Sequence, residues 1–187
     1  MFRRILPQAK LLSEEVIEPG DIVIDATCGN GHDTKFLADA VGSDGTVFSF
    51  DIQAQALANA KDLCQSHNNI EFILDSHANL GRYIPEGTPI RAAMFNLGYL
   101  PKGDKEITTV YESTSVALSE IFNRLTVGGR IIIVVYHGHP SGKIERDKLL
   151  ASLSHWSQKE AQVLKYQFIN QKNDAPFLLC VEKISMP

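Results

Sequence analysis

The sequence has few cysteines, no long apolar run and no excess of positive charge. Its 187 residues include three widely separated cysteines, Cys28, Cys64 and Cys180, with no C-x-x-C pair. This pattern favours a reducing compartment over a disulfide framework or a cysteine zinc site. No apolar run approaches the roughly 20 residues of a membrane span. Arg3 and Arg4 precede no long apolar segment, so we expect no signal peptide and a cytoplasmic protein without a membrane partner.

Charge and missing motifs narrow the functional classes further. Lys and Arg number 18 against 22 Asp and Glu, a net charge of −4. Composition therefore does not mark a nucleic-acid binder, and an RNA partner would need a local basic patch. The sequence has no H-E-x-x-H, G-x-S-x-G or P-loop lysine motif. We therefore expect neither the hydrolases and nucleotidases that carry these motifs nor a bound metal.

The length favours a single domain over residues 1–187 with a sizeable core. Apolar periodicity and turn residues predict strands at 22–26, 46–50, 70–74, 90–95, 130–136, 161–169 and 176–183, and helices at 5–17, 35–41, 53–67, 109–125 and 143–155. A short helix after the third strand and a turn at 127–129 are also expected. The last connection is too short for a crossover helix, so the final two strands should be antiparallel. The predicted fold is α/β, a seven-stranded and mostly parallel twisted sheet with helices on both faces and an antiparallel C-terminal hairpin.

A glycine-containing turn follows the first strand, in the run Asp25-Ala26-Thr27-Cys28-Gly29-Asn30-Gly31. Strand, glycine turn and helix form the opening unit of nucleotide-binding α/β folds. Glycines allow a sharp turn close to a ligand, and the helix that follows offers free N–H groups. Asp51 ends the second strand, about twenty residues later, where a carboxylate can reach a ribose. A tight turn without a ligand is the alternative interpretation.

Seven strands with a terminal hairpin are the architecture of class I S-adenosylmethionine-dependent methyltransferases. Residues 25–31 resemble the first motif of those enzymes, with Thr27 where the first glycine usually stands. Together with residues 96–105, 136–139 and the stretch 163–171, they resemble the tRNA 5-(aminomethyl)-2-thiouridine methyltransferases, a family first labelled rRNA methylases. The resemblance implies S-adenosyl-L-methionine as cofactor and the anticodon region of tRNA as partner. It implies N-methylation of the aminomethyl group at the wobble position.

The cofactor roles follow from that resemblance. The turn should hold the methionine part, Asp33 should contact its amino group, Asp51 and Gln53 the ribose, and Ser76 with His77 the adenine. The residues predicted to bind the cofactor are Cys28, Gly29, Asn30, Gly31, Asp33, Asp51, Gln53, Ser76 and His77. The alternative interpretation of Asp33 is a carboxylate that stabilises the first turn of a helix. The alternative interpretation of His77 is a surface residue at a strand end.

The tetrapeptide Asn96-Leu97-Gly98-Tyr99 resembles the Asn-Pro-Pro-Tyr signature of amino methyltransferases, without its prolines. The Asn96 side-chain oxygen and the Leu97 carbonyl can accept the hydrogens of an amine and aim its lone pair. Tyr99 can stack on a flipped base. Asn96 and Tyr99 are therefore the predicted catalytic residues.

Other side chains are predicted to contact the substrate. Tyr136, His137 and His139 follow the fifth strand, next to the fourth in the expected sheet. For RNA docking the candidates are Lys102 and Lys105, with Arg3 and Arg4. Each of these four also reads as an ordinary solvated charge.

Three alternatives stay open. The methyl acceptor is rRNA or another amine; the chain is a nicotinamide-dependent oxidoreductase; or it binds a cofactor without catalysis and serves as a partner protein. Against the oxidoreductase, Thr34 stands where a third glycine would be expected, and the C-terminal hairpin is unusual. The proton acceptor and the oligomeric state, with a homodimer as one candidate, are not determined by the sequence.

Overall fold

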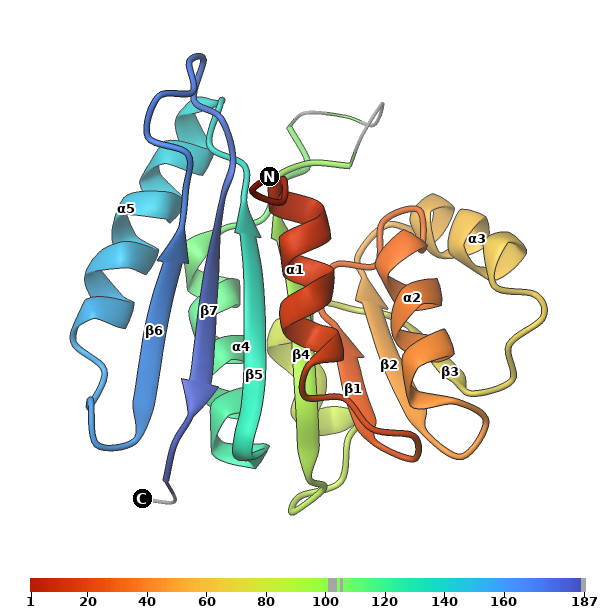
Figure 1. Ribbon diagram of the computed structural model, residues 1–187. Helices are drawn as coiled ribbons and strands as arrows, with labels where there is room; N and C mark the ends of the chain where they lie inside the picture. The colour runs from red at the N-terminus through yellow and green to blue at the C-terminus, as the bar shows by residue number, and fades with distance from the viewer. Residues whose placement is uncertain (101–103, 105, 186–187) are drawn as a thin grey trace.

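A single seven-stranded sheet organises the protein (Figure 1). The computed structural model describes residues 1–100, 104 and 106–185. The strands are β1 (Ile22–Asp25), β2 (Thr46–Asp51), β3 (Ile70–Leu74), β4 (Ile90–Leu97), β5 (Leu125–Val135), β6 (Ala161–Tyr166) and β7 (Phe177–Lys183), in the order β3-β2-β1-β4-β5-β7-β6. Strand β7 is antiparallel to both of its neighbours, and the first five strands are mutually parallel. The predicted fold class is confirmed.

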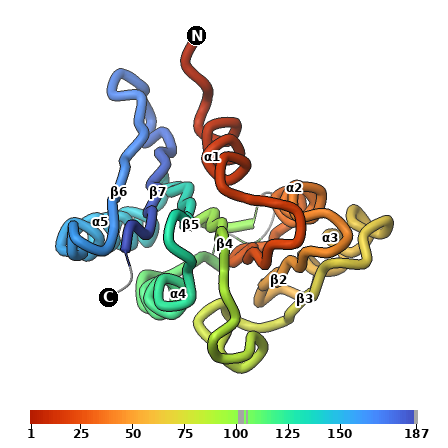
Figure 2. The backbone as a smooth tube through the Cα atoms, turned by 60° about the horizontal axis from the view of Figure 1, so that its bottom comes forward, coloured from red at the N-terminus to blue at the C-terminus, as the bar shows by residue number. Residues whose placement is uncertain are grey.

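Helices cover both faces of the sheet. They are α1 (Ile5–Glu14), α2 (His32–Val41), α3 (Ala54–Leu63), α4 (Tyr111–Arg124) and α5 (Pro140–Ser154), with a 3₁₀ helix, η1 (His77–Arg82). Helices α1 and α2 pack on one face, and η1, α4 and α5 pack on the other. Figure 2 shows α1 and α4 on opposite sides of the central strands. Because both faces are covered, Val23 and Ile24 of β1 are both completely buried, as expected for a central parallel strand.

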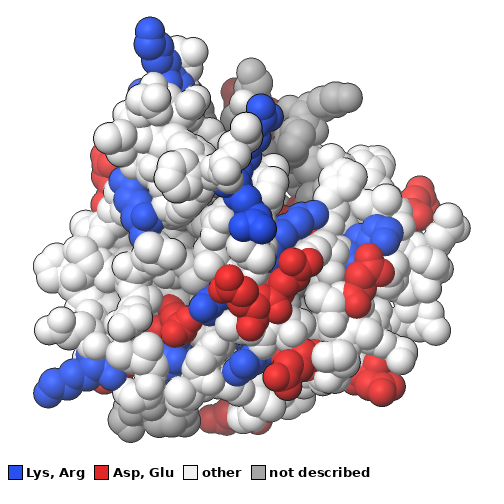
Figure 3. Space-filling model, viewed as in Figure 1, with Lys and Arg blue, Asp and Glu red and all other residues white. Residues whose placement is uncertain are grey.

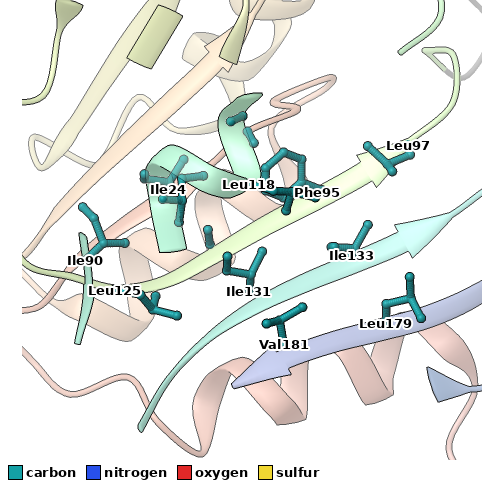
Figure 4. Close-up of a cluster of buried hydrophobic side chains, with 14 of the residues drawn as sticks. Ile24, Ile90, Phe95, Leu97, Leu118, Leu125, Ile131, Ile133, Leu179 and Val181 are labelled. Atoms are coloured by element: carbon teal, nitrogen blue, oxygen red, sulfur yellow. The ribbon is translucent and has the colours of Figure 1, made fainter. Parts of the chain in front are cut away.

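The larger core cluster lies between β4, β5, β7 and α4 (Figure 4). Phe95, Ile131 and Ile133 are completely buried, and Leu118 from α4 packs against them. Complete burial of such a side chain contributes roughly 1.5–3 kcal/mol. The central strands therefore form a firm base for the loops that follow their carboxyl ends.

Several boundaries differ from the sequence predictions. Helix α5 begins at Pro140 rather than at residue 143, because proline without an N–H suits the first helical position. The turn predicted at 127–129 lies inside β5, where the pairing register with β4 shifts between Ile90 and Ala92. Helices α1 and α3 end at Glu14 and Leu63, earlier than predicted. None of the helices in the described part of the chain is long and apolar enough to cross a membrane.

Candidate active site

The glycine turn after β1 and the tetrapeptide after β4 lie side by side at one rim of the sheet. Strands β1 and β4 are parallel neighbours, with Asp25 opposite Met94. The Asn96 backbone N–H donates to Thr27 Oγ1 at 2.7 Å, and Asn96 Nδ2 donates to Asp33 Oδ2 at 2.6 Å. Asn96 thus contacts both the turn and the first turn of α2. The two segments therefore meet at this rim of the sheet.

The conformation of the glycine turn requires its glycines. Gly29 and Gly31 have φ values of +53° and +87°, in the left-handed region that glycine favours. A Cβ on Gly31 would lie 2.7 Å from the Cα of Ala60, on α3. The close approach at Gly31 is therefore to a neighbouring helix rather than to a ligand. Asn30 links the same two elements, since its Oδ1 accepts a hydrogen bond from Asn59 at 3.1 Å.

The Asp51 carboxylate faces the glycine turn. Its Oδ2 accepts the Gly29 N–H at 2.8 Å, and its Oδ1 accepts the Gln53 N–H at 2.9 Å. These two bonds fix the orientation of the carboxylate at the end of β2. A carboxylate has about four acceptor sites, so two remain for a pair of ribose hydroxyls.

A buried polar network supports the turn, and sequence reasoning assigned it no role. Asp25 is completely buried, and its carboxylate accepts hydrogen bonds from Thr34 Oγ1 at 2.6 Å and from the Thr27 N–H at 3.2 Å. Thr34 Oγ1 also lies 2.7 Å from Ser49 Oγ. Burial, with the nearby charge of Asp33, raises the pKa of Asp25 to about 7. Thr34, which stands where a third glycine would be expected, therefore supplies a hydroxyl that the buried acid needs.

The residues predicted to contact adenine differ in exposure. Ser76 caps η1, since its side chain accepts the Ala78 N–H at 3.2 Å. His77 is buried beside Phe95, and its Nδ1–H donates to the Ala26 carbonyl at 2.8 Å. Burial lowers the pKa of His77, so the ring is neutral. Its Nε2 is buried and has no hydrogen-bond partner among the described residues, so the ring exposes no polar atom for the predicted contact with adenine.

The acceptors proposed for an amine are not equally free. The Leu97 carbonyl accepts the Tyr136 N–H at 2.9 Å as part of the β4–β5 pairing. The Asn96 amide donates its Nδ2 to Asp33, which orients its Oδ1 away from that carboxylate. The Asn96 oxygen is therefore the better placed acceptor of the two.

Aromatic side chains gather around the loop after β4. Tyr99 and Tyr136 are each 37% exposed. Tyr99 packs edge-on against His139, with ring centroids 5.3 Å apart, and His139 Nε2 lies 3.2 Å from Thr108 Oγ1. Burial and the charge of Asp33 raise the pKa of Tyr136, and its Cβ lies 3.2 Å from the position that a Cβ on Gly98 would occupy. Three of the predicted substrate and catalytic residues thus lie together.

His137 has a different environment from His139. It is buried, its Nε2–H donates to the Ala175 carbonyl at 3.1 Å, and its Nδ1 accepts from Arg146 at 3.2 Å. Both ring nitrogens are used inside the protein, so neither is left for the predicted substrate contact. Lys102 and Lys105 lie outside the described residues.

Glu145 on α5 holds the loop after β4 and was missed by sequence reasoning. The Gly98 N–H donates to Thr109 Oγ1 at 2.9 Å, and Thr109 Oγ1 donates to Glu145 Oε2 at 2.6 Å. Thr114 donates to the other carboxylate oxygen at 2.8 Å. Burial raises the pKa of Glu145. No motif in the sequence distinguishes this glutamate from exposed acidic residues such as Asp147 on the same helix.

The charges around the turn suit a cationic ligand. Asp25, Asp33 and Asp51 are close enough for the charges of the latter two to raise the pKa of Asp25. S-adenosylmethionine carries a sulfonium and an ammonium group, which the carboxylates of Asp33 and Asp51 would attract. In the described part of the chain, no three His, Cys, Asp or Glu side chains gather as ligands for a metal ion. The residues present therefore fit this cofactor.

Comparison with known proteins identifies the family. The sequence profile of the family described as "Putative rRNA methylase" matches residues 47–182. The tRNA (mnm(5)s(2)U34)-methyltransferase, chloroplastic, of Arabidopsis thaliana is 36% identical over 174 residues, which are 87% of this chain and 64% of that protein. The chain thus spans less than two thirds of the length of this relative.

Solved structures agree with this assignment. A "putative rRNA-methylase" from Clostridium thermocellum has a TM-score of 0.95 and 43% identity, covering 98% of this chain and all of that one. A "putative methyltransferase" from Streptococcus mutans, solved in complex with SAH, has a TM-score of 0.90 and 37% identity over the same shares. The chain therefore belongs to this family of S-adenosylmethionine-dependent methyltransferases.

Proposed function

We propose that the protein transfers a methyl group from S-adenosylmethionine to the aminomethyl group of 5-aminomethyl-2-thiouridine at the wobble position of tRNA. The observation that carries the proposal is the contact of Asn96 with Thr27 and Asp33, because it puts an amine acceptor beside the predicted cofactor turn. The name of the Arabidopsis relative supports the choice of substrate. That relative is chloroplastic, so a cytoplasmic location for this chain stays a prediction.

The residues act mainly by positioning. The bound cofactor supplies an electrophilic methyl group on its sulfonium. Asp51 holds the ribose, and the Asn96 oxygen accepts an amine hydrogen so that the nitrogen lone pair points at the methyl carbon. The exposed rings of Tyr99 and Tyr136 stack on the flipped base. Alignment of the reacting atoms can supply a large part of the rate acceleration.

The two alternative activities differ in support. Acceptance of rRNA is supported by the names of the solved relatives, and it keeps the same donor and the same Asn96 chemistry. The negative charge near the glycine turn argues against a nicotinamide dinucleotide as the cofactor. Its anionic pyrophosphate would approach the turn next to the Asp33 carboxylate at the start of α2, and like charges repel.

Methyl transfer to defined RNAs tests the proposal. Labelled S-adenosylmethionine is incubated with the protein and tRNA that carries unmethylated 5-aminomethyl-2-thiouridine, and the nucleosides are then separated. We expect label in the methylaminomethyl nucleoside and none with matched tRNA that carries plain uridine. Transfer to rRNA without transfer to this tRNA would end the tRNA assignment and keep the enzyme class.

A further inference from the structure

Three basic side chains near the N-terminal arm and the β6–β7 hairpin lack acidic partners. Arg3 and Arg4 precede α1, and Lys172 belongs to the β6–β7 connection. All three are exposed, and none forms an ion pair with a described acidic residue. Figure 3 shows Lys and Arg side chains over the hairpin and around the N-terminal end of α1. We call residues 1–4 together with residues 165–172 the arm–hairpin surface.

Aromatic contacts hold the two parts of this surface together. Tyr166 Oη donates to the Arg3 carbonyl at 2.7 Å. Phe168 packs against Phe2 and Tyr166, with ring centroids 6.5 and 5.5 Å away. The next residue, Ile169, is 95% exposed. The basic side chains therefore project from an ordered edge of the molecule.

The arm–hairpin surface is connected to the predicted acceptor site. His137 donates to Ala175 at 3.1 Å, and Lys143 forms an ion pair with Asp174 at 2.9 Å, so the hairpin is fastened to the start of α5. His139 caps that helix and packs against Tyr99. One continuous set of contacts thus leads from the Tyr99 ring to the exposed cations.

We propose that the arm–hairpin surface docks the phosphate backbone of the RNA whose target base enters the site. The inference rests on the proposed function. The chain as a whole carries a net charge of −4, and three exposed cations without acidic partners cluster on this surface, so it offers an RNA a favourable approach. Charge complementarity favours RNA over a protein partner, because phosphates recur regularly along the backbone and each can take one cation.

Salt-dependent RNA binding tests this surface. The probe is an anticodon stem-loop RNA with 5-aminomethyl-2-thiouridine at the wobble position, titrated between about 50 and 200 mM salt. The test variant combines Arg3→Ala with Lys172→Ala. The control combines Lys61→Ala with Lys159→Ala, two exposed lysines on α3 and between α5 and β6, also without a described ion pair. We expect the test variant to raise Kd about tenfold and to lower the salt slope by roughly 1.5, and the control to stay within about twofold.

The outcomes separate this inference from the proposed function. A test variant with the wild-type Kd and salt slope would contradict the proposal that RNA docks on the arm–hairpin surface, even if methyl transfer to the tRNA is normal. Wild-type binding without any salt dependence would overturn it too. If the RNA binds with the expected pattern and receives no methyl group, the substrate assignment fails and the docking surface stands. Melting temperatures with and without S-adenosylhomocysteine verify that every variant is folded.

Discussion

Asn96 links the two halves of the candidate site, so its removal should separate binding from chemistry. Replacement by alanine deletes the acceptor for the amine and the bond to Asp33, and leaves Asp51 and the glycine turn in place. We expect Asn96→Ala to lower kcat about 100-fold, since loss of alignment costs about that much, with S-adenosylhomocysteine affinity within about threefold of wild type. Asn123→Ala, at an exposed position on α4, is the matched control. Unchanged turnover in Asn96→Ala would remove this residue from the mechanism.

The buried acid Asp25 should make stability depend on pH. Its pKa is raised from 3.8 to about 7 by burial and by the charge of Asp33, so the folded protein keeps a proton that the unfolded chain releases near pH 4. The stability due to this proton is complete below pH 4 and is lost as the pH rises to 7. This group lowers the free energy of unfolding by about 1.4 kcal/mol per pH unit in that window.

Urea unfolding between about pH 4 and 7 measures this dependence. Asp25→Asn removes the titrating group, so we expect a flatter pH profile in the variant, and the difference between the two profiles isolates the contribution of Asp25. Parallel profiles would show that the folded protein does not retain the proton.

Single residues also show which features of the candidate site could be predicted from the sequence. The spacing of Asp51 and the order of the strands were enough to locate the carboxylate at the turn. The buried state of His137 could not be predicted from the sequence, because it depends on the packing of the hairpin, whose Ala175 carbonyl accepts from a residue 38 positions away. Thr34 was noticed as a missing glycine, and its bond to Asp25 emerged only in three dimensions.

At the scale of elements, α5 and the loop after β4 act together. The sequence predicted the helix, with its start at residue 143 rather than at Pro140. Their connection through Glu145 depends on the packing of α5 against α4, which no local pattern encodes. Glu145 accepts from Thr109 and Thr114, and Thr109 in turn holds the Gly98 N–H.

Glu145 should therefore act as a positioning residue. Glu145→Gln keeps the size of the side chain and replaces one acceptor oxygen with a donor, so one of the two threonine hydroxyls loses its acceptor and has to reorient. We expect kcat to fall about tenfold through the displaced loop, with KM for RNA and S-adenosylhomocysteine affinity nearly unchanged. Glu112→Gln is the control, because Glu112 is an exposed residue on α4 paired with Lys148. An equal effect of both changes on kcat would assign Glu145 a purely general role in stability.

At the scale of the whole molecule, the sequence was most informative about the order and direction of the strands. Five buried strands alternating with helices predicted a parallel sheet, and the short connection before residue 176 predicted the antiparallel β7. The carboxyl ends of parallel strands share one rim, which is why segments 69 positions apart, such as Thr27 and Asn96, could be assigned to one site. The bulge in β5 was missed, because the two glycines at 128–129 suit a turn and an irregular strand equally well.

A ligand that binds this rim should stabilise the entire fold, and the choice of ligand separates the two cofactor hypotheses. At about 100 times its Kd, a ligand raises the free energy of unfolding by roughly 2.7 kcal/mol, or about 5–10 °C in Tm for a chain of this size. We expect this shift with S-adenosylhomocysteine and none with NAD. Asp51→Ala removes the carboxylate that faces the turn and should abolish most of the shift. Asp62→Ala, an exposed acid on α3, should retain it. A shift with NAD alone would instead favour the oxidoreductase, whatever the similarity of the fold.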